Sequence, residues 1–213
     1  MSNIQITENE SGKYSPEWFY NEAQKPEWIA FIRKADTLHE NFINHFGIEH
    51  LKSLSGKELL TSLFYNDKGN KLNLCYVLEM DKDMREIFGS IAGGAAYKFG
   101  LFFHKKTQSW TCGSPAKPVK LTENEAIQKA EEIRNDLVAG AEIISSFGSL
   151  DSEEDYKQLY IQLEHIPGIN MVWRMKYYQM LFPALFAPFY GQDIQLRVLH
   201  FLNQTPSDIP FIR

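Results

Sequence analysis

Cysteine is scarce in this sequence of 213 residues, which contains only Cys75 and Cys112. The two cysteines form no CxxC pair and have no paired histidine nearby, which excludes a disulfide framework and argues against a zinc site. The histidines are scattered as well, and His39 and His45, six residues apart on one predicted helix, do not share a face. We therefore expect two free, buried thiols and no bound metal.

Long apolar runs are also missing. No segment approaches the roughly 20 apolar residues that a membrane-spanning helix needs. The first five residues, Met-Ser-Asn-Ile-Gln, lack the charged and then apolar pattern of a secretory signal. With 44% hydrophobic residues, the chain can nevertheless bury a core. These features predict a cytoplasmic protein that does not engage a membrane.

The signatures of common catalytic sites are absent. The chain has no phosphate loop, no Gly-x-Ser-x-Gly, no dinucleotide-binding glycine turn and no plausible Cys/His nucleophile pair. The stretch Glu79-Met80-Asp81-Lys82 faintly matches the acidic end of a metal-dependent nuclease strand, but no second carboxylate precedes it at a strand end. We predict no catalytic residue and no cofactor, and an enzyme is the least favoured class.

Acidic residues are absent from residues 87–122, in a chain whose formal net charge is −5. Five lysines in this window contribute +5, so the rest of the chain carries −10. Positive charge attracts phosphate and flat rings stack on bases, so the window is a candidate DNA contact. The candidate residues are Lys98, Lys105, Lys106, Lys117 and Lys120 for phosphate, with Tyr97 or Trp110 for stacking. The alternative is a glycine-rich sheet with one apolar and one solvated face.

Hydrophobic periodicity predicts helices before and after a small sheet. Apolar residues recur at three- and four-residue spacing over residues 28–46, which predicts a helix whose stripe is core, including Trp28. A shorter helix through Trp18 precedes it. Ser55 with Glu58, and Thr122 with Glu125, have the spacing of capping boxes and mark two further helix starts.

Alternating apolar and polar residues predict strands in the middle of the chain. Residues 72–80 and 84–91 are expected to be strands, and residues 99–103 and 109–112 a hairpin. Pro115 and Pro118 should end the sheet.

These elements predict an α+β fold with N-terminal helices, a small antiparallel sheet around residues 71–113 and a C-terminal helical block. We expect a single domain over residues 1–213, with residues 1–14 loosely held.

Several stretches together match a known family. They are WFY at 18–20, LSGKELL at 54–60, LCYVLE at 74–79, and the segments 88–100 and 181–190. This pattern resembles the N-terminal region ahead of the AAA+ motor in McrB-like proteins, which restrict DNA with modified cytosine. The resemblance implies a role in target recognition or assembly, with a motor C-terminal of Arg213 or on another chain. That family's base-flipping recognition pattern is missing, so methylcytosine binding is implied for no residue.

Two functions remain open. The first is a non-catalytic DNA-recognition module of a restriction or phage-defence system, which binds duplex DNA, modified or unmodified, through the lysine-rich window. The alternative is a protein-interaction module that tethers a AAA+ motor or nuclease partner through the aromatic segment 177–190, whose aromatic residues could equally pack against the N-terminal helices.

Overall fold

The structure is a computed structural model that describes residues 16–64, 71–91, 96–114, 116–168, 172–186 and 196–199. Contacts within the chain divide it into two compact units, residues 41–188 and residues 1–40 together with 189–213. The expectation that residues 1–14 are loosely held lies outside the described residues.

The first unit contains α1 (Pro16–Ala23) and most of α2 (Pro26–Phe46). Both helices begin with a proline followed by a glutamate, which suits the first helical turn and complements the helix dipole. The predicted core stripe is wrong for the start of α2, because Trp28 is 46% exposed; Trp18 on α1 is 38% exposed as well.

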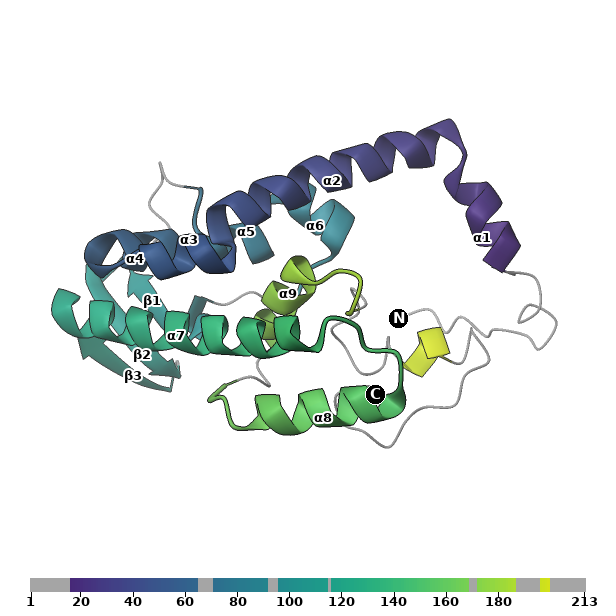
Figure 1. The fold of residues 1–213 in the computed structure, drawn as a ribbon. Helices are drawn as coiled ribbons and strands as arrows, with labels where there is room; N and C mark the ends of the chain where they lie inside the picture. The colour runs from purple at the N-terminus through teal and green to yellow at the C-terminus, as the bar shows by residue number, and fades with distance from the viewer. Residues whose placement is uncertain are drawn as a thin grey trace. The chain divides into compact units, whose positions relative to one another are not determined.

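The second unit contains the end of α2 and most of the helices that the structure describes. They are α3 (Ile48–Ser53), α4 (Gly56–Leu63), α5 (Leu74–Glu79), α6 (Lys82–Phe88), α7 (Glu123–Phe147), α8 (Glu153–Glu164) and α9 (Val172–Leu181), with η2 (Ala96–Phe99) as a 3-10 turn. α4 and α8 both pack along the long helix α7, on opposite sides of it (Figure 1).

Helix caps follow the sequence closely at α7. The Thr122 side chain accepts a bond from the Glu125 amide, and the Glu125 carboxylate accepts one from the Thr122 amide, so the predicted capping box is confirmed. Ser55 is the N-cap residue of α4, as expected, but its side chain accepts no bond, so that box does not form.

Two predicted strands are wrong. Residues 72–80 and 84–91 fold as α5 and α6 instead. Leu74, Val77 and Leu78 are buried, a spacing of three and four residues that matches one helix face. Asn73 and Asp81 cap the two helices, with their side chains 3.0 Å from the amides of Tyr76 and Met84.

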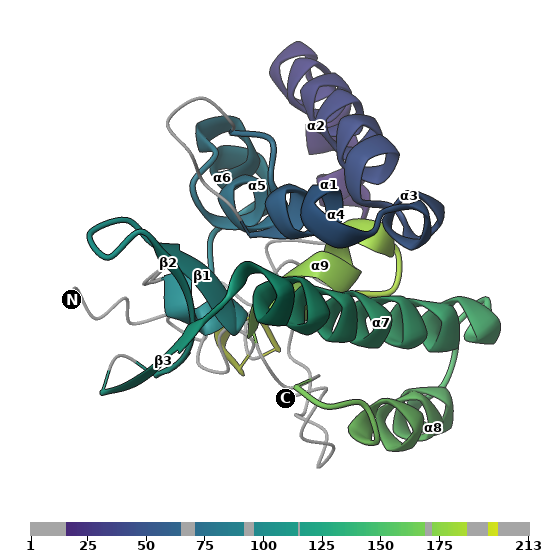
Figure 2. The ribbon, with the colours of Figure 1, turned by 90° about the vertical axis from the view of Figure 1, so that its left-hand side faces the viewer.

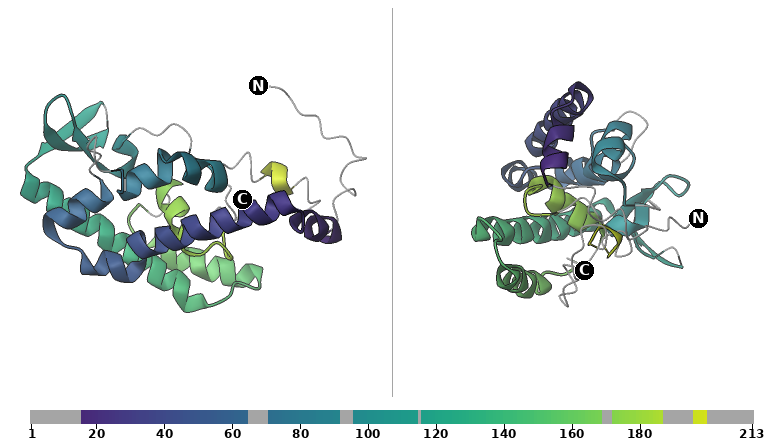
Figure 3. Two further views of the ribbon diagram at one scale, coloured as in Figure 1. Left: turned by 90° about the horizontal axis from the view of Figure 1, so that it is seen from above. Right: turned by 90° about the vertical axis from the view of Figure 1, so that its right-hand side faces the viewer.

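The sheet is antiparallel, with β1 (Leu101–His104), β2 (Ser109–Ser114) and β3 (Lys117–Leu121) in that order. The predicted hairpin is confirmed, and so is the α+β class, but the sheet covers residues 101–121 rather than 71–113. Pro118 lies within β3 rather than after the sheet, which is possible because β3 is an edge strand. Figures 2 and 3 show the strands gathered at the N-terminal end of α7.

α9 supplies the centre of the core in the second unit. Trp173, Tyr177 and Tyr178 are almost fully buried. The Tyr177 hydroxyl donates to the Phe46 carbonyl oxygen at 2.8 Å, and its ring packs against Phe42. The aromatic residues of α9 therefore pack onto the C-terminal end of α2.

Candidate nucleic-acid interface

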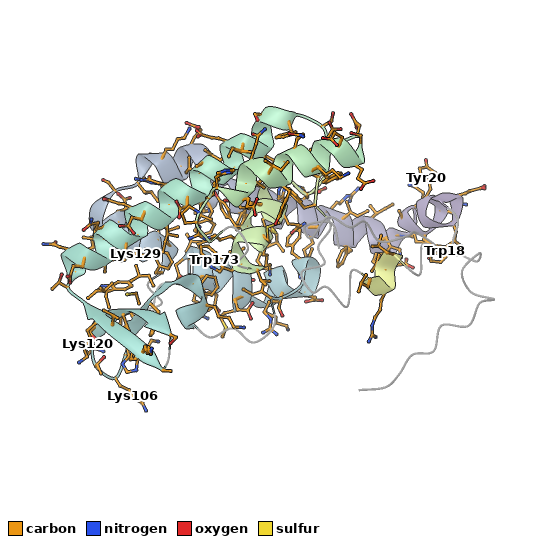
Figure 4. All side chains as sticks on the ribbon, turned by 90° about the horizontal axis from the view of Figure 1, so that it is seen from below. Trp18, Tyr20, Lys106, Lys120, Lys129 and Trp173 are labelled. Carbon is orange, nitrogen blue, oxygen red and sulfur yellow. The ribbon has the colours of Figure 1, made fainter. Side chains whose placement is uncertain are left out.

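The turn between β1 and β2 presents two lysines to solvent. Lys105 and Lys106 are both exposed in the four-residue turn that follows His104. Lys106 extends away from the sheet (Figure 4). A hairpin tip is free of neighbours on several sides, so both ammonium groups can approach a large polyanion.

Side-chain hydrogen bonds hold this turn in one shape. The Thr107 amide donates to His104 Nδ1, and the Thr107 hydroxyl lies 2.7 Å from the same nitrogen and 2.8 Å from the Ser109 hydroxyl. Gln108, with a φ of 48°, donates from its side chain to the Lys105 carbonyl oxygen at 2.7 Å. These bonds fix the backbone beneath the two lysines, which lowers the entropy lost when a ligand binds them.

The register of β3 places its two lysines on opposite faces. Lys120 pairs with Thr111, whereas Lys117 pairs with Ser114 at the other end of the sheet. Both are exposed, but residues three apart on a strand point to different sides. Lys120 lies near the hairpin tip and Lys117 away from it. We call Lys105, Lys106 and Lys120 the tip lysines; Figure 4 shows Lys106 and Lys120 at the same end of the sheet.

The other predicted contacts fall elsewhere. Lys98 is half-buried in η2. Trp110 is only 7% exposed and its ring packs edge-on against Phe103 at 5.3 Å between centroids, so it offers no open face to a base. The backbone of Tyr97 lies in η2, and its side chain is outside the described part. The structure therefore brings together three of the seven predicted residues.

Carboxylates that follow the sheet already have partners. Glu123, the first residue of α7, lies 3.1 Å from the ammonium group of Lys57. Glu125 is held in the capping box, and its bonds from the amide and side chain of Thr122 lower the pKa of its carboxyl group. The charge of Glu123 is thus offset by Lys57, whereas Glu125 stays ionised at the start of α7.

A buried polar cluster on α9 has no counterpart in the sequence predictions. Lys176 is fully buried, and its ammonium group donates to the carbonyl oxygens of Leu78 and Gly89. These oxygens lie at the C-terminal ends of α5 and α6, where the helix dipole favours a cation. Glu79 is also buried and accepts a bond from the Ile91 amide at 3.1 Å.

Burial lowers the pKa of Lys176 to about 8, while the charge of Glu79 raises it and that of Arg85 lowers it further. A lowered lysine pKa also occurs at catalytic sites, where the neutral amine acts as a base or nucleophile. Here the amine has no access to solvent, and it donates to backbone carbonyl oxygens. These hydrogen bonds join α9 to the C-terminal ends of α5 and α6.

Arg174, on the same helix, makes a second set of buried hydrogen bonds to other parts of the chain. It is 5% exposed, donates to Asp136 at 3.3 Å and also donates to the Pro167 carbonyl oxygen. Its Nε and the Trp173 Nε1 have no hydrogen-bond partner. The bonds that Arg174 does make join α9 to α7 and to the segment that follows α8.

The nuclease interpretation finds no support in the described residues. Glu79 is bound to the Ile91 amide and Asp81 caps α6, so both carboxylates have structural roles. Across the described ranges, no group of three or more His, Cys, Asp or Glu side chains is arranged to hold a metal ion. Cys75 and Cys112 are free and half-buried.

Comparison with known proteins does not identify a relative. No family model, no curated protein and no solved structure matches the chain. Among the described helices, none is long and apolar enough to cross a membrane.

Proposed function

We propose that this chain is a non-catalytic DNA-recognition module of a restriction or phage-defence system, which binds duplex DNA through the tip lysines. The observation that carries the proposal is the exposure of Lys105, Lys106 and Lys120 at one end of a sheet whose whole sequence window lacks an acidic residue. The resemblance to the N-terminal region of McrB-like proteins gives the biological context and supplies a AAA+ motor or nuclease subunit as the expected partner.

The chemistry of lysine defines what this surface contributes. An ammonium group is a point charge that binds phosphate without reading the base sequence, so the tip lysines provide affinity and position the protein. Three contacts predict weak binding, on the order of 10 µM at physiological salt. Because Trp110 is buried, Tyr97 is the remaining aromatic candidate for a base contact, and a Tyr97→Ala change tests that role.

The direct test is a fluorescence-anisotropy titration with modified and unmodified duplexes at several salt concentrations. Binding should weaken as salt rises, because phosphate contacts release counterions. Replacing both Lys105 and Lys106 with glutamate should weaken binding to every duplex. The matched control replaces Lys71 and Lys82, exposed lysines outside the window, with glutamate and changes net charge by the same amount. Undetectable or salt-insensitive binding by the unaltered protein would refute the proposal.

The lysines of β3 have a competing structural explanation. Lys117, Pro118 and Lys120 lie on an edge strand, where charge and proline prevent strands of neighbouring molecules from pairing. This explanation does not extend to the turn, since Lys105 and Lys106 are not in a strand. The variant with glutamate at Lys105 and Lys106 therefore tests DNA contact alone, because it leaves the edge strand β3 unchanged.

The tethering alternative depends on the aromatic residues of segment 177–190. Tyr177 and Tyr178 are fully buried, so they form part of the core and not a docking surface. Residues 187–190 are outside the described part of the chain. The DNA proposal is therefore preferred, and co-purification of a motor or nuclease subunit that is lost when residues 187–190 are changed would favour the alternative.

A further inference from the structure

His104, the last residue of β1, accepts hydrogen bonds from the turn that carries Lys105 and Lys106. Its Nδ1 lies 3.3 Å from the Thr107 amide nitrogen and 2.7 Å from the Thr107 hydroxyl. An amide N–H group can only donate, so Nδ1 must keep a free lone pair to accept this bond. The turn therefore selects the form of the imidazole in which Nδ1 carries no hydrogen.

The hydroxyl groups of the turn fit the same form of the ring. The Ser109 and Thr107 hydroxyls lie 2.8 Å apart. They can donate in series, from Ser109 to Thr107 and from Thr107 to Nδ1, so that each hydroxyl hydrogen has an acceptor. A hydrogen on Nδ1 would instead face the amide hydrogen of Thr107. The neutral imidazole with its hydrogen on Nε2 satisfies all of these groups.

The other ring nitrogen, Nε2, is thus a hydrogen-bond donor at the tip of the hairpin. His104 is half-buried, and within the described ranges the hydrogen bonds of its ring all involve Nδ1. His104 pairs with Ser109, and Lys120 pairs with Thr111, two residues further along β2. Directly paired residues share a face of a sheet, as do residues two apart on one strand. The side chains of His104 and Lys120 therefore lie on the same face.

We propose that His104 is a further DNA-contact residue, whose neutral Nε2–H group donates a hydrogen bond to a phosphate oxygen of the duplex. The inference rests on the proposed function, because it concerns the same surface as the tip lysines. Their ammonium groups and this N–H group are all donors, and a phosphate offers only acceptors. An ammonium group attracts phosphate from many directions, whereas a ring held by the turn donates in one direction. The lysines supply the attraction, and His104 fixes where the phosphate lies.

Two substitutions at position 104 separate DNA contact from support of the turn. Asparagine can place its carbonyl oxygen near the position of Nδ1 and keep the bond from Thr107, but it has no counterpart of the Nε2–H group. Glutamine can place its amide near the position of Nε2, but it loses the acceptor for Thr107. In the anisotropy titration, His104→Asn should weaken binding about tenfold, and His104→Gln should weaken it less. The opposite order would show that His104 acts only through the turn and would overturn the proposal.

Salt dependence distinguishes a neutral donor from a cation. A neutral N–H group releases no counterion, so His104→Asn should lower the association constant by the same factor at every salt concentration. A shallower slope in this variant would mean that His104 binds as a cation, which contradicts the proposal. The loss should also be equal for duplexes of different sequence, and a loss confined to one sequence would place the contact on a base instead of a phosphate.

Two controls complete the experiment. His50→Asn, at an exposed histidine of α3, should bind DNA like the unaltered protein. Nitrogen NMR spectra of the imidazole groups in the free protein should show His104 with its hydrogen on Nε2, and a hydrogen on Nδ1 would overturn the inference. If glutamate at Lys105 and Lys106 abolishes binding while His104→Asn has no effect, the proposed function stands and this inference falls. An unaltered protein that binds no DNA overturns both.

Discussion

Replacing Lys176 with methionine should change how the stability of the protein depends on pH. Burial lowers the pKa of this lysine from its ordinary 10.5 to about 8 in the folded state. Between these two values the unfolded chain holds a proton that the folded protein has released. Because the unfolded state then binds more protons, raising the pH stabilises the fold.

The size of the effect follows from the two pKa values. From about pH 7.5 to about pH 9.5, titration of Lys176 should add roughly 2 kcal/mol to the free energy of unfolding. Other groups oppose it: burial raises the pKa of the Cys75 thiol and of the Tyr177 hydroxyl, so each favours the unfolded state as the pH rises. These groups are present in both proteins, and the difference between the unaltered protein and Lys176→Met isolates the lysine.

Urea denaturation followed by circular dichroism at the two pH values gives the required free energies. The unaltered protein should gain roughly 2 kcal/mol more than Lys176→Met over this range. Lys157→Met, on the surface of α8, serves as the control for loss of a lysine. Equal pH dependence in the unaltered and Lys176→Met proteins would show that folding does not lower the pKa of Lys176.

Two further changes test the helical packing. Gly140→Ala on α7 would place a methyl group 2.2 Å from the Tyr178 hydroxyl. We expect the free energy of unfolding to fall by about 1–3 kcal/mol, although alanine has the better helix propensity. Adding Tyr178→Phe should recover part of this loss. Thr122→Ala removes the capping box of α7 and should lower stability by about 1 kcal/mol, whereas Thr122→Ser should lower it little. Thermal denaturation measures all of these variants. Unchanged stability in Gly140→Ala would contradict the close approach of Tyr178, and unchanged stability in Thr122→Ala would contradict the capping box.

The sequence predicts the long helices well because their periodicity is sustained and their caps are explicit. It fails for α5 and α6 because a short apolar segment carries two periodicities at once. The spacing of Leu74, Val77 and Leu78 matches a helix. The apolar residues at every second position from 72 to 80, which include Leu74 and Leu78, also match a strand. Asn73 and Asp81 are both favoured N-cap residues, and giving them weight would have favoured helices over strands for these two segments.

The candidate site could be predicted only as a list of residues. The lysine window is visible in the sequence, but strand register decides which members are close, and it separates Lys117 from Lys120. Burial of Trp110 could not be foreseen from its position on a short strand. Lys176 and Arg174 could not be found either, because charged residues on a helix are normally exposed. These two are buried, and they donate hydrogen bonds to α5 and α7.

The most direct test of the proposed function is the salt dependence of DNA binding. For contacts from the tip lysines, the logarithm of the association constant should fall with the logarithm of salt concentration at a slope of about −3, and glutamine at Lys105 and Lys106 should reduce that slope by about 2. Glutamine at Lys71 and Lys82 should leave it unchanged. An unchanged slope in the Lys105 and Lys106 variant would contradict the proposal that the hairpin tip contacts DNA.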